Sequence, residues 1–196
     1  MSEPQCEIRP NGNKEWRVNG ILHREDGPAI IRANGDMFWY FNGKLHRNDG
    51  PAIMWASGDQ NWYRDNELHR DDGPAIVGVD GGQQWHRDGK PHREDGPAII
   101  CDDGSQGWFI NGELHREDGP AVVRADGSQE WHRNGKLHRE DGPAVILANG
   151  TQIWYLNGDR HREDGPAIVY TDGFGEYWER DRRIIKNDHA THAARR

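Results

Sequence analysis

Residues 126–148 read Asp-Gly-Ser-Gln-Glu-Trp-His-Arg-Asn-Gly-Lys-Leu-His-Arg-Glu-Asp-Gly-Pro-Ala-Val-Ile-Leu-Ala, and this 23-residue unit recurs in phase along nearly the whole chain. One histidine of each unit opens a His-Arg-x-Asp-Gly-Pro-Ala segment, in the copies that begin at His23, His46, His69, His92, His115, His138 and His161. One tryptophan of each unit keeps the same spacing, at Trp16, Trp39, Trp62, Trp85, Trp108, Trp131 and Trp154. Such a period predicts one small structural unit stacked on copies of itself.

Two turn signals and two strand signals make up the unit. Asp-Gly at 126–127 and Asn-Gly at 134–135 favour the positive φ angles of tight turns. Residues 128–133 are therefore expected to form a short strand, and the β-branched stretch 144–148 a second one. No helix of useful length fits between these signals.

The segment between the two strands, 134–143, is expected to be a long connection. Its Asp-Gly-Pro should form a turn in which the Asp141 side chain accepts backbone hydrogen bonds. Each unit is then a β-hairpin joined to the next by a two-residue turn. The predicted fold class is all-β, an elongated and twisted antiparallel sheet of about seven tandem hairpins plus caps, and a closed β-solenoid is the alternative.

The predicted domain organisation is one repeat domain over residues 1–186. Within this domain the expected parts are an N-terminal half-unit cap at 1–11, the repeats at 12–173 and a charged C-terminal cap at 174–186. A basic, flexible tail is expected at 187–196. Cys6 and Cys101 lie about four units apart, too far for a disulfide, and are expected to be free thiols.

Composition and charge narrow the class of partner. The formal net charge is −8, although residues 180–196 carry six basic and two acidic residues, so the body before them is more acidic than the whole. An acidic body argues against direct binding to nucleic acid or to anionic membrane lipid. The sequence shows no secretion signal and no apolar run near the roughly 18 residues of a membrane span, which predicts a cytoplasmic protein.

The phases of Trp, Asn-Gly and His resemble the repeat of the MORN family. The pattern Trp-x-x-Asn-Gly-x-x-His is shared, and His-Arg-Glu-Asp-Gly-Pro-Ala replaces that family's usual His-Gly-x-Gly over residues 12 to about 175. The resemblance implies a sheet of successive hairpins and a role in scaffolding, partner binding or, in some members, contact with membrane lipid. Arrays with this loop also resemble proteins of phages and large DNA viruses, which would place the chain in a host cytoplasm.

No catalytic set is expected. A position that is identical in every copy of an array is best explained by a structural need shared by every copy, so the repeated His and Trp positions are interpreted as structural. His69-Arg70-Asp71 matches the start of a kinase catalytic loop, but no other kinase element accompanies it. We expect no enzyme, no cofactor and no bound metal, with a site inside one loop, such as His115, Glu117 and Asp118, as the open alternative for a metal.

Candidate binding residues are sought where the copies differ. The position after each tryptophan is mostly aromatic and forms a column of Tyr40, Tyr63, His86, Phe109, His132 and Tyr155. The most variable position follows the second strand and includes Arg32, Trp55, Arg124 and Tyr170, residue types enriched at protein interfaces. For the aromatic column, burial against neighbouring strands is an equally good interpretation.

The leading functional hypothesis is a non-catalytic scaffold that binds a macromolecule, most simply a protein with a basic surface, through an acidic and aromatic sheet face. A first alternative is a phage-type inhibitor that occupies a basic surface of a host defence or nucleic-acid-binding protein. A second is a binder of small ligands, nucleotides or glycans that uses the aromatic column. A third is a structural protein of a virion. The sequence does not distinguish a monomer from a homo-oligomer.

Overall fold

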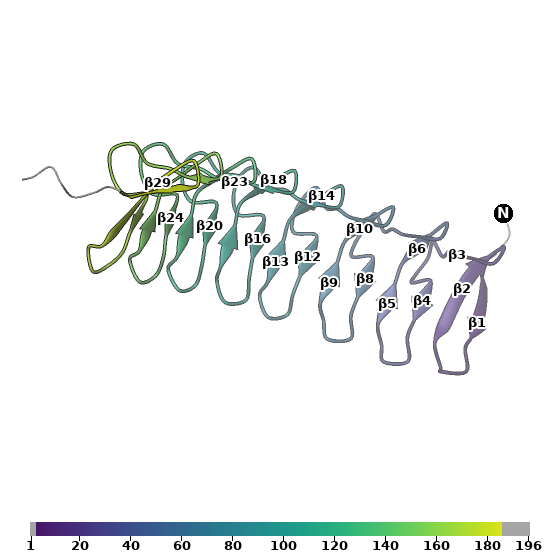
Figure 1. Cartoon of the computed structure of the whole chain (residues 1–196). Helices are drawn as coiled ribbons and strands as arrows, with labels where there is room; N and C mark the ends of the chain where they lie inside the picture. Colours follow the sequence, from purple (N-terminus) through teal and green to yellow (C-terminus); the bar gives the residue numbers. More distant parts are fainter. Residues whose placement is uncertain (1–2, 186–196) are drawn as a thin grey trace, which may run out of the picture. The chain divides into compact units, whose positions relative to one another are not determined.

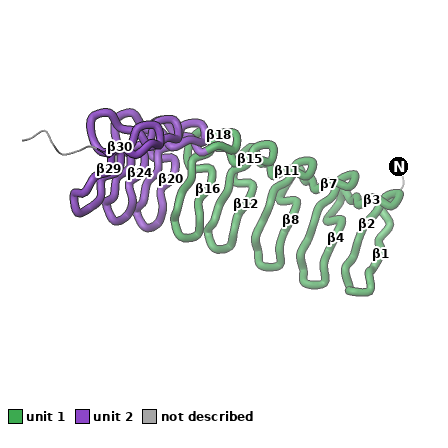
Figure 2. Tube along the Cα trace, in the orientation of Figure 1, with its two compact units in different colours: residues 1–113 green, residues 114–196 purple. Residues whose placement is uncertain are grey.

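The computed structural model of the protein describes residues 3–185, and within them every regular element is a β-strand. The chain divides into two compact units, residues 1–113 and 114–196 (Figure 2). The predicted tail and the last residue of the predicted C-terminal cap lie outside the described residues. In the described part of the chain there is no helix with the length and apolar character needed to cross a membrane.

Unit 1 contains a main sheet in which each strand pairs antiparallel with the next one in order. Its strands are β1 (Gln5–Ile8), β2 (Lys14–Val18), β4 (Ile30–Ile31), β5 (Met37–Phe38), β8 (Ile53–Met54), β9 (Gln60–Asn61), β12 (Ile76–Val77), β13 (Gln83–Gln84), β16 (Ile99–Ile100) and β17 (Gln106–Gly107). Each repeat thus adds two neighbouring strands to the sheet.

Unit 2 repeats this order of strands. Its main sheet runs through β20 (Val122–Val123), β21 (Gln129–Glu130), β24 (Val145–Ile146), β25 (Gln152–Ile153), β28 (Ile168–Val169) and β29 (Gly175–Glu179), again with antiparallel pairing throughout. The sheet is open in both units, which confirms the predicted hairpin array. The alternative of a closed β-solenoid is therefore wrong.

A second row of small hairpins follows the main sheet in both units. The pairs are β6 (Tyr40–Phe41) with β7 (Lys44–Leu45), β10 (Tyr63–Arg64) with β11 (Glu67–Leu68), β14 (His86–Arg87) with β15 (Lys90–Pro91), β22 (His132–Arg133) with β23 (Lys136–Leu137), and β26 (Tyr155–Leu156) with β27 (Asp159–Arg160). The strands β18 (Phe109–Ile110) and β19 (Glu113–Leu114) occupy the same places in their repeat. Near the chain ends, β3 (Ile21–Leu22) pairs with β2, and β30 (Arg182–Ile184) pairs with β29.

This second row corrects the sequence prediction in two ways. The expected strand at 128–133 is broken at Trp131 into β21 and β22, which belong to different hairpins. The expected long connection at 134–143 contains a strand, β23. The break occurs because the Trp131 backbone N–H bonds to the Ala144 carbonyl at 2.7 Å while its own carbonyl accepts from the His138 N–H at 2.9 Å, so the tryptophan joins the two hairpins.

The two turns of a repeat differ in geometry. At 134–135, both Asn134 and Gly135 have positive φ, 50° and 74°, which is the two-residue turn that matches the twist of a hairpin. At 126–127, only Gly127 has positive φ, and the Arg124 N–H bonds to the Ser128 carbonyl, so three residues close that turn and the predicted two-residue turn between units is wrong. Within each unit the three-residue turns lie along one edge of the sheet and the His-Arg loops along the opposite edge (Figure 1).

The core is thin. One alanine of each repeat, the residue that follows Gly-Pro, is fully buried: Ala29, Ala52, Ala75, Ala98, Ala121, Ala144 and Ala167 are each 0% exposed. The repeated tryptophans are half-buried, and among the described residues no large side chain is completely buried.

Candidate functional site

The arginine of each His-Arg-x-Asp-Gly-Pro loop lies over the tryptophan of its own repeat. In the third repeat the Arg70 guanidinium carbon is 4.1 Å from the centre of the Trp62 ring. Its Nε donates to Asp72 Oδ1 at 2.9 Å and its Nη1 donates to the Pro74 carbonyl at 3.2 Å. The same stacking, at 4.0–4.2 Å, occurs for Arg24, Arg47, Arg93, Arg139 and Arg162. The loop is therefore a clamp around a cation–π contact.

The aspartate of the loop differs from its predicted role. Asp141 accepts chiefly from the Arg139 Nε, at 2.9 Å, and only secondarily from its own backbone N–H. This hydrogen bond and the guanidinium charge hold the pKa of the Asp141 carboxyl below its usual value. The equivalent carboxyls have lowered pKa values for the same first cause, as at Asp26, Asp49, Asp72, Asp95, Asp118 and Asp164.

The histidine of each loop connects its repeat to the next one. His92 Nδ1 accepts the backbone N–H of Asn111, at 3.1 Å, and the N–H lies in the Asn-Gly turn of the following repeat. The same Nδ1 lies 3.0 Å from Asn111 Oδ1, and Nε2 faces Glu94 Oε1 at 3.4 Å. His23, His69, His115 and His138 accept the same N–H from their following repeats. The predicted structural role of these histidines is thus accounted for by specific bonds.

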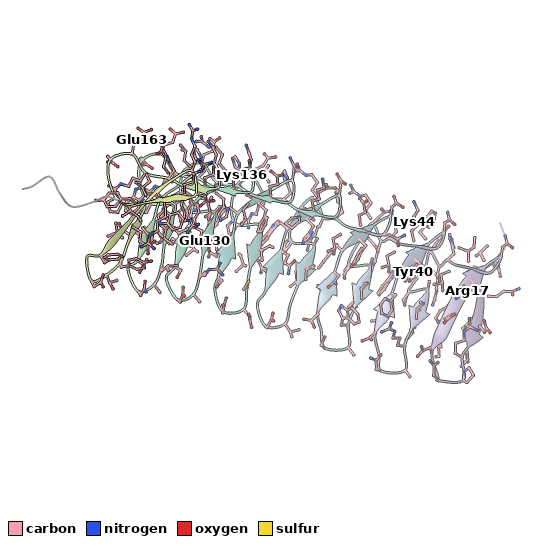
Figure 3. The ribbon with its side chains drawn as sticks, in the orientation of Figure 1. Arg17, Tyr40, Lys44, Glu130, Lys136 and Glu163 are labelled. Atoms are coloured by element: carbon pink, nitrogen blue, oxygen red, sulfur yellow. The ribbon has the colours of Figure 1, made fainter. Side chains whose placement is uncertain are left out.

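The third loop residue carries an exposed charge outside the clamp, and in three repeats it lies near an arginine of the preceding hairpin: Asp71 near Arg64, Glu94 near Arg87 and Glu140 near Arg133. This residue is acidic in six of the seven loops, and its side chain is 68–91% exposed in Glu25, Asp71, Glu94, Glu117, Glu140 and Glu163. Figure 3 shows Glu163 at the loop edge of its unit, whereas Glu130 lies over the strands. In most repeats the contact between the carboxylate of the third loop residue and the Nε2 of its own histidine is long. His115 Nε2 and Glu117 Oε1, for example, are 4.0 Å apart.

Neighbouring loops of unit 1 enclose open grooves between them. One groove is lined by Arg24 to Pro28 on one side and by His46 to Asp49 on the other, with Trp39 and Phe41 at its base. A second groove follows one repeat later, between Arg47 to Pro51 and His69 to Asp72. The carboxylates of successive loops therefore form a series along this edge of the unit.

The predicted aromatic column is not a freely exposed stripe. Tyr40, Tyr63, Phe109 and Tyr155 are half-buried, and the two histidines of the column, His86 and His132, are 7% and 8% exposed. Burial raises the pKa of Tyr40 and of Tyr155 and lowers the pKa of His86. Packing against the neighbouring strands is thus the main environment of this column.

The variable column has mixed environments. Arg32 and Arg124 are exposed, and Trp55 and Tyr170 are half-buried. Arg124 Nη2 binds Glu130 Oε1 at 2.7 Å, and the Tyr170 hydroxyl donates to Glu176 at 3.2 Å. Trp55 makes an edge-on contact with Phe38, with ring centres 5.6 Å apart.

A third column, missed in the sequence, joins the other two. It is the residue before each tryptophan, and in two repeats, at Glu15 and Glu130, it contacts both the variable residue and the residue after the tryptophan. Glu130, for example, binds Arg124 at 2.7 Å on one side and His132 Nε2 at 3.0 Å on the other. The signal was available, because the residues on either side of a given residue in a strand share one face.

The described residues contain no group of three or more His, Cys, Asp or Glu side chains placed to hold a metal ion. In the one loop considered for such a site, Asp118 is bound to the Arg116 Nε at 2.9 Å. Cys6 and Cys101 are free and exposed, as predicted.

Comparison with known proteins adds no assignment. No model of a known protein family matches the chain, and no curated protein matches its sequence. The observed class is therefore a tandem array of antiparallel β-hairpins with a clamped loop in each repeat, and the resemblance to MORN repeats stays a prediction.

Proposed function

We propose that this protein is a non-catalytic scaffold that binds a protein partner with a basic surface, and that the acidic residues at the third position of the loops are its main contacts. The observation that supports this proposal is that the residues of the loop make different contacts. The arginine and the fourth-position aspartate bind each other in the clamp, and the histidine binds the backbone of the following repeat. The third-position and fourth-position carboxylates are both highly exposed, as in Glu94 at 74% and Asp95 at 82%, but the third-position carboxylate is not part of the clamp.

The charge balance of the loops agrees with this proposal. The seven loops contain thirteen carboxylates and seven arginines, so each unit presents a net negative edge. Charges that recur at regular spacing on a stiff support attract an oppositely charged partner and orient it before contact. The aromatic column is already packed, and it is therefore assigned a smaller part in binding than the sequence alone indicates.

The test compares two variants of equal net charge. The loop variant replaces Glu25, Glu94, Glu117, Glu140 and Glu163 by Gln. The matched control replaces five exposed glutamates that lie outside the loops, Glu3, Glu7, Glu67, Glu113 and Glu179, by Gln. Each immobilised protein is incubated with lysate of the source organism, and the retained proteins are identified by mass spectrometry after elution with increasing salt.

We expect a partner of basic net charge that wild type and the control retain and the loop variant does not. This partner should elute as salt rises toward about 1 M, where the Debye length falls to ~3 Å. Equal retention by the loop variant, elution only by denaturant, or retention of no partner at all would each contradict the proposal.

A further inference from the structure

A hollow of about 450 Å³ opens on the strand face of unit 1. Asn61, Ile76 and Gln84 form its floor as one row across three strands, because Ile76 of β12 pairs with Asn61 of β9 on one side and with Gln84 of β13 on the other. Trp55, at the end of β8, lines one side of the hollow. Asp59 and Asp80 lie among its polar lining residues.

Two glycines line the hollow. Gly78 stands at the variable position, where other repeats have residues such as Arg32 or Tyr170, and its N–H bonds to the Gly82 carbonyl at 2.8 Å. Gly82 stands where another repeat has Ser128. Neither glycine has positive φ, so no turn conformation requires glycine at these positions. The Asp80 carboxylate lies where a Cβ on Gly78 would stand and 3.1 Å from a Cβ built on Gly82, so this carboxylate and the backbone form that part of the lining.

The lining combines an apolar ring with amide groups. His86 Nε2 and Gln84 Oε1 are 3.2 Å apart. Since burial lowers the pKa of His86, the ring is neutral, and with its proton on Nε2 it donates to Gln84 and leaves the Gln84 amide N–H groups to donate elsewhere. No hydrogen bond occupies the Asn61 side chain within the described part of the chain.

The carboxylates restrict the charge of a ligand. Hydrogen bonds from Ser57 and from the Val79 backbone hold the pKa of the Asp59 carboxyl below its usual value, so Asp59 is ionised at neutral pH. An ionised carboxylate beside the hollow repels phosphate groups and accepts hydrogen bonds from hydroxyls. These conditions fit a neutral, hydroxyl-rich ring and disfavour a nucleotide.

We propose that this hollow binds one ring of a neutral saccharide, with Trp55 packed on the apolar face of the ring and Asn61 and Gln84 hydrogen-bonded to its hydroxyls. An apolar wall with a few placed polar groups is the usual composition of a small-ligand site. The proposal is independent of the basic protein partner, because its residues lie on the strand face and not on the loops.

The test uses substitutions that other repeats already contain. Trp55→Leu introduces the residue found at the same phase in Leu147, and Gly82→Ser introduces the residue found in Ser128, so both changes are compatible with the repeat. Tyr170→Leu is the matched control, since it makes the same kind of change at the same phase in unit 2. Thermal melting of each variant establishes that it is folded.

Binding is measured by saturation-transfer NMR of the full chain with maltotriose, cellotriose and chitotriose, followed by titration of the saccharide that gives the strongest signal. We expect saturation transfer from the protein to at least one of the three saccharides. The affinity for that saccharide should fall about tenfold or more in Trp55→Leu and in Gly82→Ser, and it should be unchanged in Tyr170→Leu.

Absence of saturation transfer to any of the three saccharides overturns the proposal. Wild-type affinity in both Trp55→Leu and Gly82→Ser overturns it as well, because binding would then lie elsewhere. Saturation transfer to ATP under the same conditions, with loss of that signal in Trp55→Leu, would assign the hollow to a different ligand class. This outcome would also overturn the proposal.

Discussion

The glycine that precedes each loop proline is required for space and not for backbone conformation. Gly73 does not have positive φ. A Cβ at this position would lie 3.0 Å from the Arg70 guanidinium carbon and 3.2 Å from its Nε. The Asp-Gly-Pro sequence was interpreted as a turn signal, whereas its glycine makes room for the arginine that covers the tryptophan.

The substitution Gly73→Ala should therefore lower the free energy of unfolding by about 1 kcal/mol, because it displaces the guanidinium from its cation–π contact. In an Arg70→Ala background the same substitution should cost much less. Urea unfolding of the four proteins measures this coupling. Gly81→Ala serves as the control, since Gly81 has a φ of 93° and nothing lies within 4 Å of its added Cβ, so its cost should be equal in both backgrounds. An equal cost of Gly73→Ala in both backgrounds would contradict the interpretation.

A second prediction at this scale concerns His86, which is 7% exposed and whose pKa is lowered by burial. The unfolded chain then binds a proton more readily than the folded one. The contribution of His86 to the free energy of unfolding should be complete above the unfolded pKa of about 6.5, and it should decrease as the pH falls below that value. His86→Phe, which introduces the residue found at the same phase in Phe109, should remove this component. Thermal melting of both proteins between pH 5 and 8 checks it, and an unchanged pH dependence in the variant would refute it.

At the scale of the element, the loop is held by ionic hydrogen bonds that acid can break. The carboxyls of the seven loop aspartates have lowered pKa values, first because each accepts from an arginine, as Asp95 does from Arg93. Their contribution is complete above the unfolded pKa of about 3.9 and is lost as the pH falls through their lower folded values.

We therefore expect the array to lose stability steadily below about pH 4. Replacing Asp72, Asp95 and Asp118 by Asn should reduce the acid-dependent part, and replacing the third-position Glu94, Glu117 and Glu140 by Gln should have a smaller effect. Circular dichroism during acid titration of the two triple variants measures the difference. A larger effect of the glutamate variant would show that the clamp is not the main acid-sensitive element.

The strands show where local pattern was sufficient and where it was not. The turn dipeptides and the β-branched pairs correctly placed β24 and the stretch that contains β21 and β22, since positive φ and β-propensity are properties of a few adjacent residues, but they did not predict the break at Trp131. Lys136–Leu137 was assigned to a connection because a two-residue strand with one charged member has almost no local signal. Its pairing with His132–Arg133 arises from the type I′ geometry of the Asn134-Gly135 turn.

At the scale of the whole molecule, each repeat contacts its neighbours through the same bonds. The Arg139 N–H bonds to the Tyr155 carbonyl at 3.2 Å, the Gly158 N–H to the Leu137 carbonyl at 2.9 Å, and His138 Nδ1 accepts the Asn157 N–H at 3.1 Å. Because these bonds join equivalent positions, the free energy of unfolding should be approximately the sum of contributions from single repeats and from the contacts between neighbouring repeats.

Deletion of residues 126–148, which joins Ala125 to Asn149 in phase, should leave a cooperatively folded β-protein with a reduced melting temperature. Deletion of residues 126–137 removes about half a unit and should abolish folding, because it places the wrong groups opposite each other at a joint. Circular dichroism melting of both deletions checks this expectation. Equal damage by the two deletions would contradict the additive description of the array.

The sequence by itself determined the period, the all-β class and the places of the two turns in each repeat. These follow from local backbone preferences and from repetition, both of which are visible in a single chain. Only the tertiary structure decided which group each side chain meets. It showed that the aspartate binds the arginine, that the aromatic column is packed, and that a hollow lies beside Trp55. Such contacts join residues about 20 positions apart in neighbouring repeats, and packing across strands, not local propensity, selects them.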